Sequence, residues 1–544
     1  MESNKKNLID LFEKNKLWSC SKFVLSLVAV SCKNVIRYEQ IIYGNALLFV
    51  FQIALYYFVF CLFEKIGELF IDYLNKNDRI NKTKYFCFFI ILIISYSVFL
   101  FIYYPGTFGW DTTNQIIDYI DGITEFSETY SGPSTIANLN NHHPFLDTLV
   151  FGFFFNLNRS ELGIFLYTLI QITLFSALFA WVLTVMQGER LFQTKKPHVL
   201  IKLTLFFWAF MPFVDIYVIT ILKDTLFSIM FIMYFVNYLL FIRKPNNKNI
   251  IALIFLSILV SVTKKTGIYI VIISNILLLF SDDIKIIKKY LIYIISSFLL
   301  PILIIFVFFP KIIFPKYNIY PGGPQDMYGT LFQQTARTVV LFEEEFTENE
   351  REKINKVFDY DIIKSNYDNN TTDPIKNTYR LDVRRNELID YFKIWLKHGV
   401  KHPIVYMQAT LGTCGGFFTI DKPINYYNSM AGNDILNLNN NIITKNLRVY
   451  IDNLYNYMTE LPLLGLLFQI VIYIWWIPIW TLLVGIKHKD KKICLMLTPI
   501  IVSILMLIVS PYTGHRYAIH QIFVSPIVLY LGIMKSADNK NVNC

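Results

Sequence analysis

Long apolar runs constrain this chain more than any other feature. Stretches such as Phe86–Tyr103, Leu291–Phe309 and Leu461–Val484 carry almost no charge over about 18–24 residues, the length of a helix that crosses a bilayer. Hydrophobic residues make up 54% of the chain and charged residues only 17%, against about 25% in ordinary globular proteins. The sequence therefore predicts an all-α, polytopic integral membrane protein with about 11–12 transmembrane helices.

The formal net charge of +10 does not indicate a nucleic-acid partner. The Lys and Arg residues lie mostly in short loops between apolar runs, where the orientation of membrane helices accounts for them. Of the seven cysteines, most lie in or beside apolar runs, so no disulfide framework is predicted. We expect membrane lipid, and no nucleic acid, among the partners.

The basic residues also predict which loops face the cytoplasm. Segments 64–84, 188–202 and 243–249 are rich in Lys and Arg, whereas segment 104–158 contains neither and has six acidic residues. Because cytoplasmic loops carry an excess of Lys and Arg, the first three segments are expected inside and the fourth outside. The basic residues of the first two loops include Arg79, Lys82, Arg190, Lys195 and Lys196.

The apolar runs predict the individual crossings. Phe145–Leu157 is too short for a comfortable crossing and is expected to be an interfacial or re-entrant helix, and 250–280 to be a hairpin of two short helices split at 263–267. Whether 17–36 also crosses stays open. The strongest crossings are expected at 41–63, 85–104, 161–187, 203–221, 224–242, 290–309, 462–486, 493–510 and 516–534.

These crossings imply five segments along the chain. They are an N-terminal cytoplasmic or interfacial segment (1–40), an N-terminal transmembrane module with an external loop at 105–160 (41–309), a large external region (310–461), C-terminal transmembrane helices (462–534) and a cytoplasmic tail (535–544). Within the external region, Thr347 to Glu350 resembles a capping box that begins a helix reaching about Phe358, and Leu381–Lys397 has the spacing of an amphipathic helix.

Asp111 is the candidate catalytic residue. It follows the turn Tyr104-Pro105-Gly106, just beyond the outer end of the predicted span 85–104. A carboxylate there can act as a general base towards a hydroxyl or help to bind a divalent cation, while a helix-capping role is the alternative. No cofactor and no metal-binding residue follow with certainty from the sequence, and a divalent cation beside Asp111 remains open.

Basic and imidazole side chains are expected near the same membrane face. His142 and His143 precede the short helix and could contact a substrate or position the Asp111 loop; two adjacent histidines are a poor metal pair because their side chains diverge. Arginine suits bidentate recognition of phosphate, and a cluster of cations at one depth could hold a lipid phosphate. The predicted substrate-binding residues there, besides the two histidines, are Lys223, Asp224, Lys264 and Arg516.

Three further candidates open the large external region. Gln333, Gln334 and Arg337 carry side chains that could contact sugar hydroxyls or phosphate, or could satisfy the local structure.

The arrangement resembles the GT-C class of integral-membrane glycosyltransferases. The shared features are an outer-loop acid after an outward helix, a downstream His-Pro pair before a short re-entrant helix, many spans and a late external region. The chain also resembles, over roughly 85–534, an uncharacterised family of bacterial multi-pass proteins related to that class. The stretches that carry this second resemblance are Tyr104-Pro105-Gly106 with Asp111 and Gln115, His142-His143-Pro144, Leu222-Lys223-Asp224, Phe332-Gln333-Gln334-Thr335-Ala336-Arg337, Thr372-Asp373-Pro374-Ile375-Lys376, Lys401-His402-Pro403 and Arg516-Tyr517.

The GT-C resemblance implies transfer of a sugar from a polyprenyl-phosphate donor to a cell-envelope acceptor, at the extracytoplasmic face of the plasma membrane. It implies that Asp111 is the catalytic base or helps to bind a metal. Many members of the class carry a paired acid in this loop, whereas Trp110 and Thr112 flank Asp111 here. The alternative functions are a transporter or a flippase for lipid-linked saccharides, in which the intramembrane charges would line a path, and a scaffold for envelope assembly.

Overall fold

The computed structural model describes residues 2–76, 84–122, 139–157, 161–188, 198–430, 433–438 and 442–540. The basic residues Arg79, Lys82, Arg190, Lys195 and Lys196 of the predicted cytoplasmic loops lie outside these ranges, as does the end of the predicted tail, 541–544. The chain divides into two compact units. Unit 1 comprises Met1–Phe70, Gly323–Lys422 and Ile504–Gly514, and unit 2 comprises Ile71–Gly322, Pro423–Ser503 and His515–Cys544.

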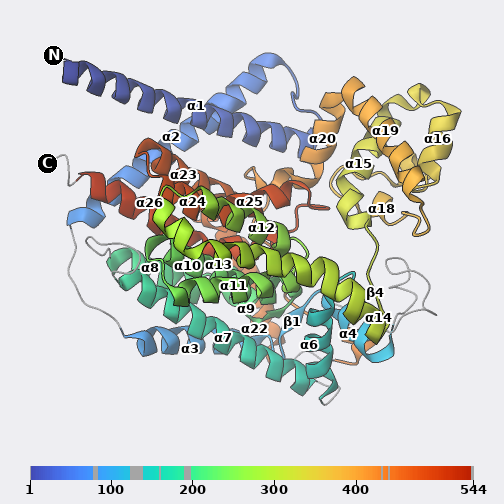
Figure 1. The fold of residues 1–544 in the computed structure, drawn as a ribbon, viewed down its shortest axis with the longest axis horizontal. Helices are drawn as coiled ribbons and strands as arrows, with labels where there is room; N and C mark the ends of the chain where they lie inside the picture. The colour runs from blue at the N-terminus through green and yellow to red at the C-terminus, as the bar shows by residue number, and fades with distance from the viewer. Residues whose placement is uncertain are drawn as a thin grey trace. The chain divides into compact units, whose positions relative to one another are not determined.

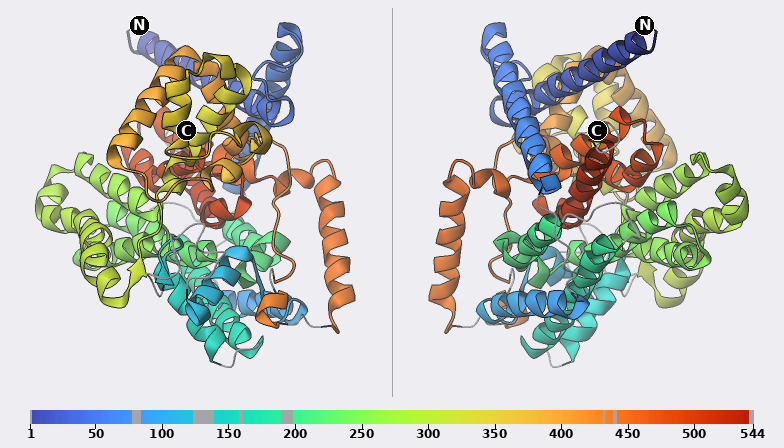
Figure 2. Two further views of the ribbon diagram at one scale, coloured as in Figure 1. Left: turned by 90° about the vertical axis from the view of Figure 1, so that its right-hand side faces the viewer. Right: turned by 90° about the vertical axis from the view of Figure 1, so that its left-hand side faces the viewer.

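Unit 1 is helical, and α15 to α20 (residues 325–414), yellow to light orange in Figures 1 and 2, form its larger group. Its core is aromatic: Phe332, Phe358 and Tyr391 are fully buried and their rings pack against one another. The elements of the unit are α1 (Glu2–Tyr38), α2 (Ala46–Lys76, as far as Phe70), α15 (Gln325–Phe342), η3 (Glu343–Glu345), α16 (Glu348–Asn355), α17 (Ile363–Asn366), α18 (Asp373–Lys376), α19 (Arg385–Lys401), α20 (Pro403–Cys414) and η4 (Gly415–Phe417).

Two sequence predictions for this unit can be compared with its helices. The capping box is confirmed: Thr347 Oγ1 accepts a hydrogen bond from the Glu350 amide, and Glu350 accepts one from the Thr347 amide, although α16 ends at Asn355 and not near Phe358. The amphipathic helix exists, but it begins at Arg385 and not at Leu381. Glu387 accepts the Arg384 amide at 2.8 Å, so the helix starts where a side chain can satisfy one of its free amide groups.

Unit 2 holds the remaining apolar helices. Helices α10, α11 and α13 pack side by side, as do α3 and α7 and, separately, α23 and α26. Its elements are α3 (Tyr85–Ile102), β1 (Thr107–Phe108), α4 (Trp110–Asp121), β2 (Leu139–Asn140), α6 (Phe145–Asn156), α7 (Glu161–Gln187), α8 (His198–Phe210), α9 (Pro212–Ile219), β3 (Thr220–Ile221), α10 (Lys223–Arg243), α11 (Asn247–Thr263), α12 (Gly267–Leu277), η1 (Leu278–Phe280), α13 (Ile284–Leu303), η2 (Ile304–Ile313), α14 (Phe314–Tyr317), β4 (Ile319–Tyr320), α21 (Asn433–Leu436), α22 (Lys445–Glu460), η5 (Gly465–Phe468), η6 (Ile472–Trp476), α23 (Ile477–Lys487), α24 (Lys491–Met496), α25 (Thr498–Ile508, as far as Ser503), η7 (His515–Ala518) and α26 (Ile519–Lys540).

The described residues include seven helices that are long and apolar enough to cross a membrane, or eight if one bent pair forms a single span. Five further apolar helices of 10–17 residues accompany them. The chain is therefore an all-α, multi-pass membrane protein, as its apolar runs predict. The long helices are Lys16–Tyr38, Ala46–Leu69, Tyr85–Ile102, Glu161–Gln187, Lys223–Arg243, Ile284–Tyr317 and His515–Ser536, and the bent pair is Val199–Phe210 with Pro212–Ile219.

The bent pair differs from the continuous span predicted at 203–221. Helices α8 and α9 meet at 58° because Pro212 has no amide hydrogen to donate to the preceding turn and its ring clashes with that turn. The carbonyl groups left free at the break find side-chain donors: the Tyr96 hydroxyl bonds the Trp208 carbonyl at 2.9 Å, and the Ser95 hydroxyl bonds that of Ala209. The span predicted at 462–486 is also shorter than expected, since its apolar helix runs only from Ile472 to Lys487.

The hairpin predicted at 250–280 is confirmed. Helix α11 ends at Thr263 and α12 begins at Gly267, with Lys264 at the turn. Gly267 is required there, because a Cβ atom would lie 2.2 Å from the carbonyl oxygen of Val260. The short helix predicted at Phe145–Leu157 is present as α6.

The large external region expected at 310–461 is divided between the units, with 323–422 in unit 1 and both 310–322 and 423–461 in unit 2. The other segment boundaries expected from the sequence stay predictions.

Candidate functional site

Two short parallel strands bring the beginnings of two helices together in unit 2. In the pairing of β1 with β3, Thr107 lies opposite Thr220 and Phe108 opposite Ile221, and the two threonine hydroxyls are 2.8 Å apart. Because α4 and α10 each begin within two residues of the end of these strands, their first turns lie side by side. Asp111 is in the first turn of α4, and Lys223 is the first residue of α10.

Glycine allows the chain to reach β1 from α3. Gly106 has a φ of +139°, and a Cβ atom there would lie 2.6 Å from the Thr168 hydroxyl of α7. A side chain at this position would therefore be strained and would collide with α7. The Pro-Gly turn noted in the sequence thus sets the close packing of the Asp111 loop on the membrane helices.

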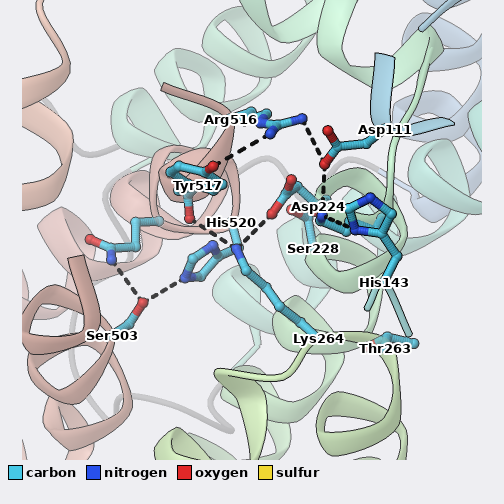
Figure 3. Close-up of polar contacts among 12 residues, drawn as sticks. Asp111, His143, Asp224, Ser228, Thr263, Lys264, Ser503, Arg516, Tyr517 and His520 are labelled. Carbon is cyan, nitrogen blue, oxygen red and sulfur yellow. Dashed lines mark hydrogen bonds and ion pairs between the residues drawn. The ribbon is translucent and has the colours of Figure 1, made fainter. Parts of the chain in front are cut away.

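The Asp111 carboxylate binds two cations. Its Oδ2 atom is 2.7 Å from Lys223 Nζ and 3.0 Å from Arg516 Nη1 (Figure 3). Arg516 belongs to η7, the turn that precedes α26. Burial alone would raise the pKa of Asp111, but the charges of Lys223 and Arg516 outweigh it and hold the pKa well below its usual range, so the carboxylate is ionised at neutral pH.

His143 completes this group. Its Nδ1 atom is 2.7 Å from Lys223 Nζ, and the residue precedes the first residue of α6 by two positions. Burial, together with the neighbouring Lys223 charge, lowers the pKa of His143 well below its usual range. The ring is therefore neutral near pH 7, and Nδ1 can accept a hydrogen bond from the ammonium group.

A second ion pair lies next to the first. Lys264 Nζ is 2.6 Å from the buried carboxylate of Asp224 and donates a hydrogen bond to the Tyr517 carbonyl at 3.2 Å (Figure 3). The Tyr517 ring lies under both Lys264 and Arg516, 5.7 Å and 5.1 Å from their cationic groups. Asp224 thus pairs with one cation, Lys264, whereas Asp111 pairs with two, Lys223 and Arg516.

The structure therefore brings Asp111, His143, Lys223, Asp224, Lys264 and Arg516 into one cluster, which we call the Asp111 cluster. His142 stands at its edge, with its ring centroid 4.7 Å from that of His143. This arrangement can bind an anion between Lys223 and Arg516 and can accept a proton at Asp111.

The other three predicted residues belong to unit 1, where protein groups occupy their side chains. Gln333 donates to the Asp368 carbonyl at 2.6 Å, and Gln334 bonds Thr410 and Trp395, both at 2.9 Å. The guanidinium group of Arg337 is buried. Its partners are Glu39, Tyr367, Asn369 and Gln408. Substrate contact by these three residues stays a prediction.

Asp147 is a feature of the Asp111 cluster that sequence reasoning missed. It lies in the first turn of α6 and is fully buried, and neither carboxyl oxygen has a hydrogen-bond partner among the described residues. Burial raises the pKa of Asp147 well above its usual range, with the Lys223 charge opposing it, so the group is protonated and uncharged near pH 7. The sequence signal was an acid inside an otherwise apolar run.

Comparison with known proteins identifies a family but no activity. The chain belongs to the family described as "Family of unknown function (DUF6020)", whose sequence model matches residues 38–543. No curated protein and no solved structure matches the chain. The resemblance to GT-C glycosyltransferases is therefore not supported by these comparisons.

Proposed function

We propose that this protein is a membrane-embedded glycosyltransferase that moves a sugar from a polyprenyl-phosphate donor to a hydroxyl group of a cell-envelope acceptor at the extracytoplasmic face. One observation carries the proposal: a single carboxylate oxygen of Asp111 is held by Lys223 and Arg516 at 2.7 and 3.0 Å. A general base and two phosphate-binding cations are the groups that such a transfer requires.

The two cations suit the phosphate of the donor. Phosphate oxygens resemble the Asp111 carboxylate in charge and in hydrogen-bonding capacity, so a donor phosphate can replace Asp111 as the partner of Lys223 and Arg516. The first turns of α4 and α10 meet at this point, and the positive ends of their helix dipoles also favour an anion.

Donor binding would also activate the base. While Asp111 is paired with two cations its pKa is too low for efficient proton abstraction. Once the phosphate takes over Lys223 and Arg516, the carboxylate loses its strongest stabilisation and its pKa rises towards the usual range. The transfer would therefore start only when the donor is in place.

The reaction is a single displacement. Asp111 takes the proton of the acceptor hydroxyl, whose oxygen forms a bond with the anomeric carbon of the donor sugar. The bond from that carbon to the phosphate oxygen breaks, and the lipid phosphate leaves with the electron pair while Lys223 and Arg516 neutralise its added charge. The product has the inverted anomeric configuration, because no covalent intermediate forms.

Sugar transfer in membranes from a deletion strain tests the proposal. Mass spectrometry of that strain should show an accumulated polyprenyl-phosphate sugar, which the wild-type protein consumes when it is added back. Asp111→Asn should lower the transfer rate by about 100-fold or more while donor binding is retained, since a positioned base contributes about this much. Arg516→Gln should weaken donor binding.

The matched control is Asp121→Asn, which removes an exposed carboxylate from the other end of α4. Full activity of the Asp111→Asn protein would contradict the proposed mechanism. Movement of the intact donor across the membrane with no transfer of its sugar would support the alternative flippase function instead.

A further inference from the structure

A second cluster of chemically reactive side chains lies in unit 1, and the proposed function does not use it. Glu345 is the last residue of η3, His398 is in the last turn of α19, and His402 ends that helix. We propose that Glu345, His398 and His402 form a binding site for a divalent transition-metal ion of the Zn²⁺ class.

The three side chains already lie almost close enough to bind one metal ion together. One potential ligand atom from each residue lies within 4.8 Å of those of the other two, and His402 Nε2 is 2.6 Å from Glu345 Oε2. A tetrahedral zinc ion with bonds of about 2.0–2.2 Å separates its ligand atoms by roughly 3.4 Å, so modest side-chain movement closes the site.

His398 is the residue that most requires a partner. Its side chain is only 2% exposed, and neither ring nitrogen has a hydrogen-bond partner among the described residues. A buried polar group with no partner costs free energy, which a metal ion bound to the ring would recover. A neutral imidazole nitrogen has a lone pair that can bind a metal ion.

Aromatic rings hold both imidazoles in position. His398 stacks on Phe346 with ring centroids 3.9 Å apart, and His402 stacks on Phe342 at 4.3 Å. His398 lies in the last turn of α19 and His402 directly follows its last residue, so both imidazoles are at this end of the helix. Pro403 begins α20 directly after His402, so the stretch Lys401-His402-Pro403, which the Asp111 cluster leaves unexplained, lies at this site.

Two lysines pair with Glu345 of the cluster and with the neighbouring Glu350. Lys401 Nζ is 2.7 Å from Glu345 Oε2, and Lys397 Nζ is 2.8 Å from Glu350 Oε1. Both lysine side chains are more than half exposed, so Lys401 can turn into water when a metal ion takes its place. Glu350, whose Oε1 is 3.8 Å from His398 Nε2, is anchored by Thr347 and can orient that ring or supply a fourth ligand.

The ligand set selects the kind of metal. Two imidazoles and one carboxylate suit Zn²⁺ and its neighbours, whereas Mg²⁺ and Ca²⁺ prefer sites made of oxygen alone. A bound ion would connect η3 to the end of α19 and would stabilise this part of unit 1.

Zinc titration of the full-length protein in detergent, after its metals have been removed with a chelator, tests the inference. At zinc concentrations that just saturate the site, the wild type should bind one more Zn²⁺ per chain than His402→Gln. The zinc affinity of His402→Gln and of Glu345→Gln should be lower by about tenfold or more, because even changes to groups that only contact a ligand cost about 10–100-fold. Zinc should also raise the melting temperature of the wild type. His488→Gln, which removes a histidine elsewhere, is the matched control.

Cobalt distinguishes this site from the cysteines. The absorption spectrum of the Co²⁺-loaded protein should show imidazole and carboxylate ligands with no thiolate charge-transfer band. Each variant is used only if its metal-free melting temperature equals that of the wild type, and Glu345→Gln serves if His402→Gln fails this check. Equal Zn²⁺ uptake by the wild type and both variants, or none by any of them, would overturn the inference and leave the cluster as an ion-pair network.

Discussion

Arg516 Nη1 lies 3.0 Å from Asp111 Oδ2, although Asp111 follows helix α3 and Arg516 lies at the start of the last long apolar helix, His515–Ser536. Lys223 binds the same oxygen, so the three side chains act as one electrostatic unit. Removing one partner of a buried ion pair leaves the other charge without its counter-ion, which is costly. Substitutions at these positions are therefore expected to affect stability.

Removal of Lys223 should destabilise the protein more when Asp111 is present than when it is absent. Lys223→Met leaves a buried carboxylate with one cation fewer, whereas Asp111→Asn together with Lys223→Met removes both charges. We expect a coupling free energy of about 1–3 kcal/mol between the two positions, measured by unfolding of the two single variants and the double variant in detergent. Additive effects would show that the two groups do not interact.

Stability should fall as the pH is lowered through the range where free histidine titrates. The pKa of His143 is lowered in the folded state, so below about pH 6.5 the unfolded chain binds a proton that the folded protein does not. The contribution of His143 is therefore lost as the pH falls, by up to about 1.4 kcal/mol per pH unit. Melting temperatures from pH 8 to 5.5 should drop less steeply for His143→Gln than for the wild type.

Two glycine substitutions should have opposite consequences. In Gly267→Ala the new methyl group would lie 2.2 Å from the Val260 carbonyl, whereas in Gly67→Ala it would meet nothing within 4 Å. The first should destabilise the α11–α12 hairpin by about 1–3 kcal/mol, and the second should be neutral or stabilise α2 by up to about 1 kcal/mol. Thermal unfolding of both proteins measures this, and equal melting temperatures would contradict the contact.

Arg337 should act on stability and not on the substrate. Its guanidinium group binds Glu39 at 2.9 Å and is almost fully buried, so Arg337→Met leaves several polar groups without their partner. We expect a loss of about 1–3 kcal/mol from the unpaired polar groups, seen as a lower melting temperature. If the sequence prediction of substrate contact is right instead, the folded fraction of this variant will bind the donor less tightly than the wild type.

The proposed face of activity can be checked by labelling. Trp110, next to Asp111, is exposed, and so is Lys244 in a loop predicted to be cytoplasmic. In intact cells, a membrane-impermeant thiol reagent should modify Trp110→Cys, but should modify Lys244→Cys only after permeabilisation. Labelling of both positions from outside, or of Lys244→Cys alone, would exclude the proposed orientation.

The membrane character of the chain was predictable from sequence. Helix α7 covers the same residues as the predicted span 161–187, and α10 differs from 224–242 by one residue at each end. A long apolar segment in lipid must satisfy its own backbone hydrogen bonds, which it does by forming a helix. The bounds of an apolar run therefore predict the bounds of a helix there. The break between α8 and α9 was missed, although Pro212 was visible, because the side chains of Ser95 and Tyr96 that satisfy the break come from another helix.

The members of the candidate sites were less predictable than the helices. The charges of the loops predicted that Asp111, Lys223 and Arg516 lie near one membrane face. That Lys223 and Arg516 both bind Oδ2 of Asp111 could not be predicted, because the contact with Lys223 depends on the pairing of β1 with β3. The same reasoning did not find Asp147, which only its burial in α6 makes unusual. Nor did it predict a site at His398 and His402.

The sequence by itself therefore determined an all-α membrane protein and the chemical types of side chain near one predicted face, because hydropathy, loop charge and helix spacing are local properties. Only the tertiary structure decided which of these side chains meet: Asp111 with Lys223 and Arg516, Arg337 with Glu39, and His398 with Glu345 and His402. Such contacts join distant parts of the chain, and they depend on packing and strand register that no local pattern encodes.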